Sequence, residues 1–259
     1  MRLVKIFCTR SILVRCILQF VFMLLASASC QTLCAQTLRV GFFDTPPHAF
    51  IKAGVPAGAA VDLFKAVSEK MGVKEVVFQQ MPLTRLVVML ERGEIDAALF
   101  MAQGPERAAK FYFPPKPYYM SQPGVVVSAS SALTHIKTMV QIKWLKIGVL
   151  QGGYLSPSMH QAGLILEPLS GSDGNARNLQ KVVRGRLDAA YTPDMYVFTL
   201  DARELGFEKL VRVLPLPDPS NGVYTAFSKK VGATYGPRYA EALEAVLKEK
   251  GEYAKAFLK

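Results

Sequence analysis

The chain has 259 residues, 51% of them hydrophobic and 20% charged, and its formal net charge is +11. This length is sufficient to bury a core and to build two lobes of roughly 100 residues each. The basic residues are scattered over the polar faces of expected helices and form no stripe interleaved with aromatic residues, so the charge does not indicate a nucleic-acid partner. The excess of positive charge favours solubility and, weakly, anionic ligands.

The first 35 residues have the features of a secretory signal peptide. Basic residues precede an apolar run over residues 16–25, and small residues follow it. The run is shorter than the roughly 20 apolar residues of a membrane span. Cleavage after Ala28 and cleavage after Ala35 both fit the sequence. We favour Ala35, because the first strand is expected to begin shortly after it, at Leu38.

All four cysteines lie within this leader, at Cys8, Cys16, Cys30 and Cys34. The leader also holds four basic residues and no acidic ones, so cleavage after Ala35 leaves 224 residues with a net charge of +7 and no cysteine. Such a protein needs no disulfide to be stable in an oxidising compartment.

Strands and helices alternate in the first half of the mature chain. Apolar runs predict strands over residues 38–43, 76–79 and 95–100, and a period near 3.6 predicts helices over residues 61–71 and 84–91. Gly104-Pro105-Glu106 is typical of a helix start, with proline at the first helical position and an acid in the first turn. This alternation predicts a mostly parallel sheet.

Two proline-rich segments interrupt the pattern, over residues 114–123 and 214–221. Between them we expect strands at 124–127, 147–150 and 187–191, and helices near 134–142, from Ser156-Pro157 and over 172–184. After the second segment we expect a strand at 223–227 and helices over 237–250 and 252–258. The proline-rich segments are therefore the expected crossings between two lobes, and two adjacent crossings form a hinge around a cleft.

One phrase occurs twice: residues 92–98 read RGEIDAA and residues 184–190 read RGRLDAA. Gly93 and Gly185 suit the left-handed position that ends a helix, and the residues after them suit a strand. Because ligands in open α/β sheets lie beyond the carboxyl ends of strands, the segments after each copy, residues 100–107 and 191–194, are the first candidates for a ligand site.

The ordered motifs resemble those of the periplasmic solute-binding proteins of ABC transporters, in the polar amino-acid-binding group, over nearly all of the mature chain. LRVGFFDTPPHAF at residues 38–50 is similar to the opening strand and loop of that family. Gly54, Gly58, Asp62 and Leu63 are in register with its helix entry. The segment from GEIDAALF to PYY, KIGVLQGG and GRLDAAY resemble its ligand-loop signature, second-lobe start and second-lobe site strand.

The resemblance implies an α/β fold of the Venus-flytrap type, a two-lobed clamp with a mostly parallel sheet flanked by helices in each lobe and two hinge strands. We assign residues 1–35 to the signal peptide, 36–120 and 220–259 to the first lobe, and 121–219 to the second. The resemblance also implies a periplasmic, monomeric protein that passes a small solute, an amino acid or another carboxylate, to an inner-membrane ABC permease.

Two charged residues match the ligand contacts of the family. Arg107 matches the arginine that holds the ligand's carboxylate, and a guanidinium can pair with a carboxylate through two parallel hydrogen bonds. Asp194 is the candidate for the partner of the ligand's amine, but it lies six residues after Asp188 where the family spacing is five, and Pro193 takes the usual place. A loop-capping role for Asp194 is an equal alternative.

Other positions depart from the family. Hydroxyl-bearing residues usually stand where this chain has Phe100 and Ala102, and a serine or threonine usually follows the glycine that corresponds to Gly152. Tyr154 adds a further aromatic ring, and Phe50 and Tyr118 are candidates for cavity walls or for core packing. These changes predict a pocket suited to a more apolar or aromatic solute than a small polar amino acid.

The remaining polar candidates favour binding over catalysis. His48, His135 and His160 have no metal-ligand spacing, and no nucleophile elbow or phosphate loop is present, so we expect no metal, no cofactor and no catalytic residue. Asp96 and Asp188 are expected to be structural, Asp44 to be a turn residue, and Arg85 is a second anion candidate. A periplasmic lyase or dehydratase and a sensory module remain alternatives on the same fold.

Overall fold

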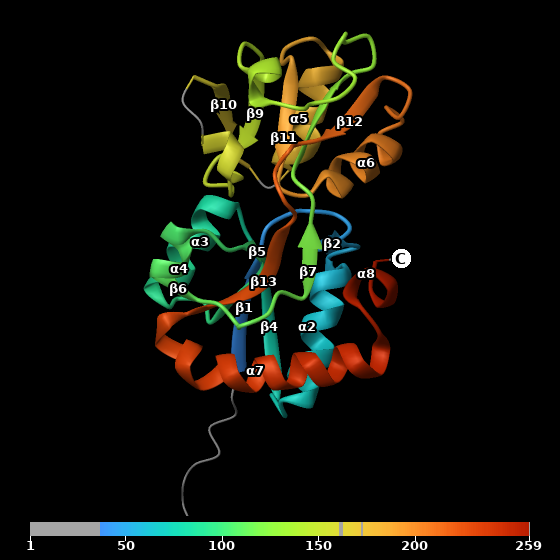
Figure 1. Ribbon diagram of the computed structural model, residues 1–259. Coiled ribbons are helices and arrows are strands. Elements are labelled where there is room, and N and C mark those ends of the chain that lie inside the picture. Colours follow the sequence, from blue (N-terminus) through green and yellow to red (C-terminus); the bar gives the residue numbers. More distant parts are fainter. Residues whose placement is uncertain (1–36, 161–162, 172, 259) are drawn as a thin grey trace, which may run out of the picture. The chain divides into compact units, whose positions relative to one another are not determined.

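The structure, a computed structural model, describes residues 37–160, 163–171 and 173–258. The predicted leader and its cleavage site lie outside these ranges. The described residues form two large sheets with flanking helices and one two-stranded sheet, which confirms the predicted two-lobed α/β architecture (Figure 1). We call the part around the six-stranded sheet the first lobe and the part around the five-stranded sheet the second lobe. Within the described ranges, no helix has the length and apolar character needed to cross a membrane.

The first lobe is built on a mixed sheet with the strand order β4-β1-β5-β13-β6, in which β7 also pairs with β13. Its centre is parallel, and β13 returns antiparallel beside β5. The strands are β1 (Thr37–Phe42), β4 (Glu75–Gln80), β5 (Ala97–Ala102), β6 (Phe111–Tyr112), β7 (Tyr119–Ser121) and β13 (Asn221–Ser228), beside the hairpin of β2 (Phe50–Lys52) and β3 (Val55–Ala57).

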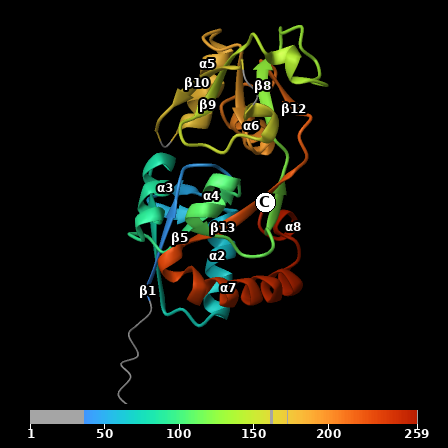
Figure 2. The ribbon, with the colours of Figure 1, turned by 60° about the vertical axis from the view of Figure 1, so that its left-hand side comes forward.

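Helices cover both faces of this sheet. On one face lie α2 (Ala59–Lys70), α7 (Lys229–Lys250) and α8 (Tyr253–Ala256), and on the other lie α3 (Leu83–Arg92) and α4 (Pro105–Lys110) (Figures 1 and 2). The predicted apolar face of α2 is confirmed, because Val61, Phe64 and Val67 are all buried in the core between this helix and the sheet. Removing this apolar surface from water is the main force that holds helix and sheet together.

The second lobe has the strand order β10-β9-β11-β8-β12, parallel from β10 to β11 and antiparallel beyond. Its elements are β8 (Gly124–Ser128), β9 (Lys146–Leu150), β10 (Ile165–Leu169), β11 (Ala189–Thr192), β12 (Val211–Pro215), α5 (Gly174–Val183) and α6 (Met195–Glu204). Val125 and Val127 point to one core of this lobe and Val126 to the other, as the two-residue period of a strand requires.

Two helices expected in this lobe are single 3-10 turns instead. The helix expected near residues 134–142 is reduced to Met139–Ile142, and the one expected from Ser156-Pro157 is reduced to Pro157–His160. Both turns close hydrophobic core beneath them, since Met139, Ile142 and Met159 are buried. A few buried side chains suffice to position a turn of this length without the periodic apolar face of a long helix.

The repeated phrase forms the same junction in both lobes. Gly93 and Gly185 have φ values of 66° and 65°, in the left-handed region, and each ends a helix. The aspartate that follows each glycine then binds the backbone of the neighbouring strand. Asp96 Oδ2 accepts from Arg39 N at 2.8 Å, and Asp188 Oδ2 accepts from Lys146 N at 2.7 Å. The structural roles predicted for both aspartates are confirmed.

The chain crosses between the sheets twice, within the two predicted proline-rich segments. One crossing joins β7 to β8 and the other joins β12 to β13. The crossings lie side by side, because Gln122 Nε2 donates hydrogen bonds to the carbonyl oxygens of Leu216 and Asp218 at 3.1 and 3.0 Å. The backbone N–H of Leu216 also donates to Pro123 O at 2.9 Å. This pairing gives the two lobes one double-stranded connection.

The last long helix starts earlier than the sequence indicates. The predicted helix begins at Pro237, whereas α7 begins at Lys229 and contains Pro237 in its interior. Gly232 and Gly236 lie against the ring of Tyr112, where an added Cβ would come within 2.4 and 2.0 Å of Tyr112 atoms. This close packing of α7 on β6 stabilises the first turns of the helix despite the proline, whose intrinsic effect is to break a helix.

Candidate functional site

The carboxyl ends of the parallel strands from both sheets meet around one cavity, as expected for open α/β sheets. Phe43 and Thr45 follow β1, Phe100 and Ala102 belong to β5, Val149 and Leu150 end β9, and Tyr191 to Pro193 end β11. The two segments predicted from the repeated phrase, residues 100–107 and 191–194, both contribute to its wall. The cavity therefore lies where the strand topology directs a ligand.

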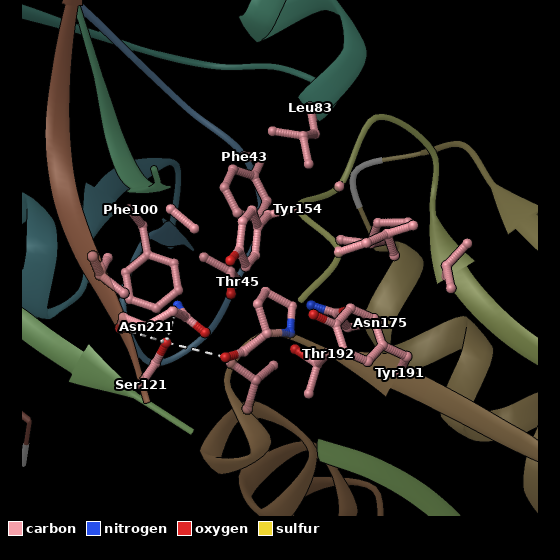
Figure 3. A pocket seen from close by; sticks show the side chains of 18 of the residues that line it. Phe43, Thr45, Leu83, Phe100, Ser121, Tyr154, Asn175, Tyr191, Thr192 and Asn221 are labelled. Carbon is pink, nitrogen blue, oxygen red and sulfur yellow. Dashed lines mark hydrogen bonds between the residues drawn. The ribbon is translucent and has the colours of Figure 1, made fainter. Parts of the chain in front are cut away.

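The cavity has a volume of about 40 Å³. Its wall is mainly apolar (Figure 3). This volume is far below the ~300–1,000 Å³ of typical ligand pockets, so a solute can enter only if the lobes separate or side chains move. The wall combines aliphatic and aromatic side chains with a few neutral polar groups and one arginine: Phe43, Thr45, Leu83, Phe100, Ala102, Arg107, Ser121, Val149, Leu150, Gly153, Tyr154, Leu155, Asn175, Tyr191, Thr192, Pro193, Val197, Asn221 and Val223.

Arg107 links the two lobes at this cavity. It lies on α4, directly after β5, and its Nη1 donates to Ala102 O at 3.1 Å while its Nη2 donates to Gly152 O of the second lobe at 2.9 Å. No carboxylate pairs with Arg107 among the described residues. Because burial disfavours the charged guanidinium, the pKa of Arg107 is lowered to about 10. An anion that enters the cavity would meet a cation with remaining N–H donors and no carboxylate in direct contact with it among the described residues.

Phe100 and Ala102 occupy the β5 positions where the family usually has hydroxyls, and both line the cavity. Phe100 has a φ of 56°, a conformation that costs a residue with a side chain about 1–3 kcal/mol. Its ring stacks on the imidazole of His48 with 3.9 Å between the ring centroids. The strained backbone therefore presents an aromatic ring to the cavity, in agreement with the predicted apolar character.

A second, larger pocket adjoins the small cavity, and Tyr154 lines both. The larger pocket has a volume of about 570 Å³ and shares Arg107, Gly153, Tyr154 and Leu155 with the cavity. The Tyr154 ring lies against Gly104 of the first lobe, where an added Cβ would be 3.3 Å from Tyr154 Cε2. Tyr154 of the second lobe therefore lies at the junction of the two pockets, in contact with the first lobe.

Asp194 does not line the cavity. It caps α6, its Oδ1 accepting from the backbone N–H of Tyr196 at 3.1 Å, and its Oδ2 lies 2.9 Å from His48 Nε2. His48 Nδ1 in turn lies 2.8 Å from the hydroxyl of Tyr253. Since an ionised carboxylate can only accept, Nε2 carries the proton and Nδ1 accepts from the tyrosine. The capping role weighed for Asp194 is thus the one seen in the structure, and His48 is its partner.

Two further candidate residues also lie away from the cavity. Phe50 is in the β2–β3 hairpin, and Tyr118 is buried in the first-lobe core with its ring centroid 4.9 Å from that of Tyr253.

Gly152 lines the larger pocket, and its carbonyl oxygen accepts a hydrogen bond from Arg107. Asp44 is half-buried and accepts from Gln80 Nε2 at 3.0 Å, and Arg85 is exposed on α3.

The structure adds polar cavity residues that the motifs did not single out. Ser121 and Asn221 come from the two crossing segments, where Asn221 Nδ2 donates to Ser121 Oγ at 2.7 Å and Ser121 Oγ donates to Pro193 O at 3.0 Å (Figure 3). Thr45 and Asn175 face the same space. Their positions beside predicted crossings and strand ends were the only signal for them in the sequence. Among the described residues, no cluster of three or more His, Cys, Asp or Glu side chains could hold a metal ion.

Residues 38–259 match the family model of the bacterial extracellular solute-binding proteins, family 3. Among curated proteins, the membrane-bound lytic murein transglycosylase F of Aliivibrio fischeri is 35% identical over 106 residues. That match covers 40% of this chain, and the chain spans 21% of the length of that relative.

Solved structures of binding proteins share the fold. An ancestral arginine-binding protein bound to arginine matches with a TM-score of 0.72 and 27% identity, over 85% of this chain and 96% of its own. The ancestral amino acid-binding protein AncCDT-1, a precursor of cyclohexadienyl dehydratase, matches with a TM-score of 0.69 and 26% identity, over 85% of this chain and 93% of its own.

Proposed function

Because the chain belongs to the bacterial extracellular solute-binding proteins, family 3, we propose that it captures a small carboxylate-bearing solute between its lobes in the periplasm and delivers it to an inner-membrane ABC permease. The observation that carries this proposal is Arg107. Its guanidinium lies at the cavity, is hydrogen-bonded to both lobes, and has no carboxylate partner among the described residues. A solute carboxylate would supply the missing anion.

The same residues couple binding to closure. Arg107 belongs to the first lobe and donates to Gly152 of the second, and Tyr154 of the second lobe packs on Gly104 of the first. A ligand can shift an equilibrium between open and closed lobes only through contacts that differ between the two states. A carboxylate held by Arg107 while aromatic walls from both lobes enclose its carbon skeleton makes those contacts only when the lobes are closed.

The test is a thermal-shift and calorimetric screen of the mature protein with amino acids, aromatic acids and short aliphatic carboxylates. A ligand at one hundred times its dissociation constant should stabilise the protein by about 2.7 kcal/mol. Arg107→Ala should lose that stabilisation, whereas Arg85→Ala, which removes an exposed arginine from α3, should keep it. Equal affinity in Arg107→Ala and the unmodified protein would contradict the assignment of Arg107.

Two further measurements separate transport from the alternatives. The ligand should be recovered chemically unchanged after incubation with the protein, because a lyase or dehydratase would convert it. Cells that lack the protein should take up less of the labelled ligand. Unchanged uptake together with tight binding would contradict delivery to a permease and would favour a sensory role.

A further inference from the structure

The charge of the cavity is unbalanced. Arg107 is the one charged side chain that lines it among the described residues, and every other lining residue is apolar, aromatic or neutral and polar. An amino acid brings both a carboxylate and an ammonium group to such a site. The carboxylate can pair with Arg107, whereas the ammonium group has no acidic partner among the described lining residues.

Asp194, which directly follows the wall residue Pro193, is already engaged. Its two carboxylate oxygens accept from the N–H of Tyr196 and face His48 Nε2, and its side chain is 3% exposed. Its neighbours Thr192 and Pro193 line the cavity, but Asp194 does not. To reach a ligand, the carboxylate would have to leave the buried Nε2 of His48 and the backbone N–H of Tyr196 without their acceptor, which is unfavourable.

The other acids near the cleft are also placed elsewhere. Asp218 is buried and accepts hydrogen bonds from Ser156 Oγ at 2.7 Å and from the backbone N–H of Ser158 at 3.0 Å. Glu106 lies in the larger pocket, is exposed, and has an oxygen 3.5 Å from Lys110 Nζ. Asp44, Asp173, Asp201 and Glu204 line a separate pocket of about 210 Å³ that meets the cavity only at Asn175. None of these four lines either pocket to which Arg107 belongs.

The cavity does offer a neutral acceptor. Asn221 Oδ1 is buried and has no hydrogen-bond partner among the described residues, while the amide nitrogen of Asn221 donates to Ser121 Oγ. A buried acceptor without a partner is unfavourable, and a hydroxyl of a ligand can satisfy it without bringing a charge into the cavity. An ammonium group at the same place would lose its hydration without gaining a counter-ion.

We propose that the cavity selects monocarboxylates in which the carbon next to the carboxylate carries hydrogen or a hydroxyl group and not an ammonium group. This inference rests on the proposed function, because it takes Arg107 as the carboxylate partner. It differs from that function in naming the class of carboxylate. The anion neutralises Arg107, the apolar wall receives the carbon skeleton, and Asn221 accepts from the hydroxyl group where one is present.

The test uses compounds that differ at a single position. The first set is 3-phenylpropanoate, 3-phenyllactate and phenylalanine, and the second is 4-methylpentanoate, 2-hydroxy-4-methylpentanoate and leucine. In calorimetry, the hydroxy acid or the unsubstituted acid of at least one set should bind at least tenfold more tightly than the amino acid. Amino acids that bind as tightly as, or more tightly than, both analogues would overturn the inference, while loss of that binding in Arg107→Ala would leave the proposed function standing.

A charge-changing variant tests where the selectivity arises. Asn221→Asp adds a carboxylate of nearly the same shape to the cavity wall and should shift the affinity ratio towards the amino acid by about tenfold. Gln103→Glu adds the same charge to an exposed residue that lines neither pocket and should leave the ratio unchanged. An equal shift in both variants would contradict a local effect. If neither set binds, the amino acid, the hydroxy acid and the unsubstituted acid are compared on the carbon skeleton of the carboxylate that the screen identifies. A screen that finds no carboxylate ligand would overturn both the proposed function and this inference.

Discussion

His48 of the first lobe and Asp194 of the second lobe form a buried contact, with 2.9 Å between Nε2 and Oδ2 and side chains that are 0% and 3% exposed. The imidazole is held between the ring of Phe100 and the hydroxyl of Tyr253. Because burial disfavours the imidazolium more than Asp194 favours it, the pKa of His48 is lowered from 6.5. A neutral histidine thus ties the start of α6 to the first lobe.

We expect His48→Ala to lower the free energy of unfolding by about 3 kcal/mol at pH 8, because it leaves the Asp194 carboxylate buried without one of its partners. The loss should be smaller at pH 5. The pKa of His48 is lower in the folded state than in the unfolded state. As the pH falls below 6.5, His48 is protonated in the unfolded state first, which reduces the stability that His48 gives the unmodified protein. Urea unfolding at both pH values measures the two differences.

His135→Ala is the matched control, since His135 is exposed. It should change the free energy of unfolding by less than about 0.5 kcal/mol at either pH. A His48→Ala variant as stable as the unmodified protein at pH 8 would contradict the stabilising role of the contact.

The sequence predicted the parts of the fold that depend on local chemistry. The repeated glycine ends a helix wherever it occurs, and the proline-rich segments cannot continue a helix or a central strand, so junctions and crossings followed from the residues themselves. The strand ends then indicated the segments 100–107 and 191–194, because the topology of a parallel sheet gathers those ends at one edge. The family resemblance singled out Phe100, Ala102 and Arg107 within the first segment, and all three line the cavity.

Contacts between distant segments could not be predicted in this way. His48 and Asp194 are 146 positions apart, and neither residue carries a local pattern that names its partner. The same holds for α7, in which packing of two glycines on Tyr112 overrides the helix-breaking tendency of Pro237. Asn221 and Ser121 come together because two crossings 100 positions apart run side by side.

The repeated aspartates should matter for stability and not for binding. Asp96→Ala should cost about 2–3 kcal/mol, because Asp96 is buried and accepts from both the backbone and the guanidinium of Arg39. Asp188→Ala should cost about 1 kcal/mol, because Asp188 is exposed and accepts from the backbone of Lys146. Urea unfolding measures both costs. Loss of ligand affinity in a variant that remains folded would restore a functional role for the aspartate concerned.

The two glycines of the repeat should respond alike to substitution. Gly93→Ala and Gly185→Ala place a Cβ on a left-handed backbone, which costs about 1 kcal/mol or more. Steric crowding is low at both sites. An added Cβ meets nothing within 4 Å at Gly185 and only the flexible Lys230 side chain at Gly93. Equal losses in urea unfolding would show that backbone conformation sets the cost, and a loss at only one site would contradict that account.

Asp201 should make the protein less stable as the pH rises. It lies on α6, it is 5% exposed, and its Oδ2 has no partner among the described residues. Burial, followed by repulsion from Glu204 and Asp44, raises the pKa of Asp201 from 3.8 to about 7. The folded state therefore holds this proton more tightly than the unfolded state does. As the pH rises from about 4 to 7, Asp201 ionises in the unfolded state but stays protonated in the folded state. Ionisation therefore stabilises the unfolded state, and the free energy of unfolding falls by up to about 4 kcal/mol.

Asp201→Asn removes this titration while keeping the shape of the side chain. The variant should have the same free energy of unfolding as the unmodified protein near pH 4 and a value higher by a few kcal/mol at pH 8. At pH 8 the Asp201 carboxyl group ionises more readily in the unfolded state, which destabilises the unmodified protein, whereas asparagine does not ionise. The difference between the two proteins at each pH cancels the titration of groups that do not interact with Asp201, whereas Glu204 and Asp44 are coupled to it. Glu204→Gln, a change at an exposed neighbour, should recover only a small part of the gain. A difference that stays constant from pH 4 to 8 would contradict the raised pKa of Asp201.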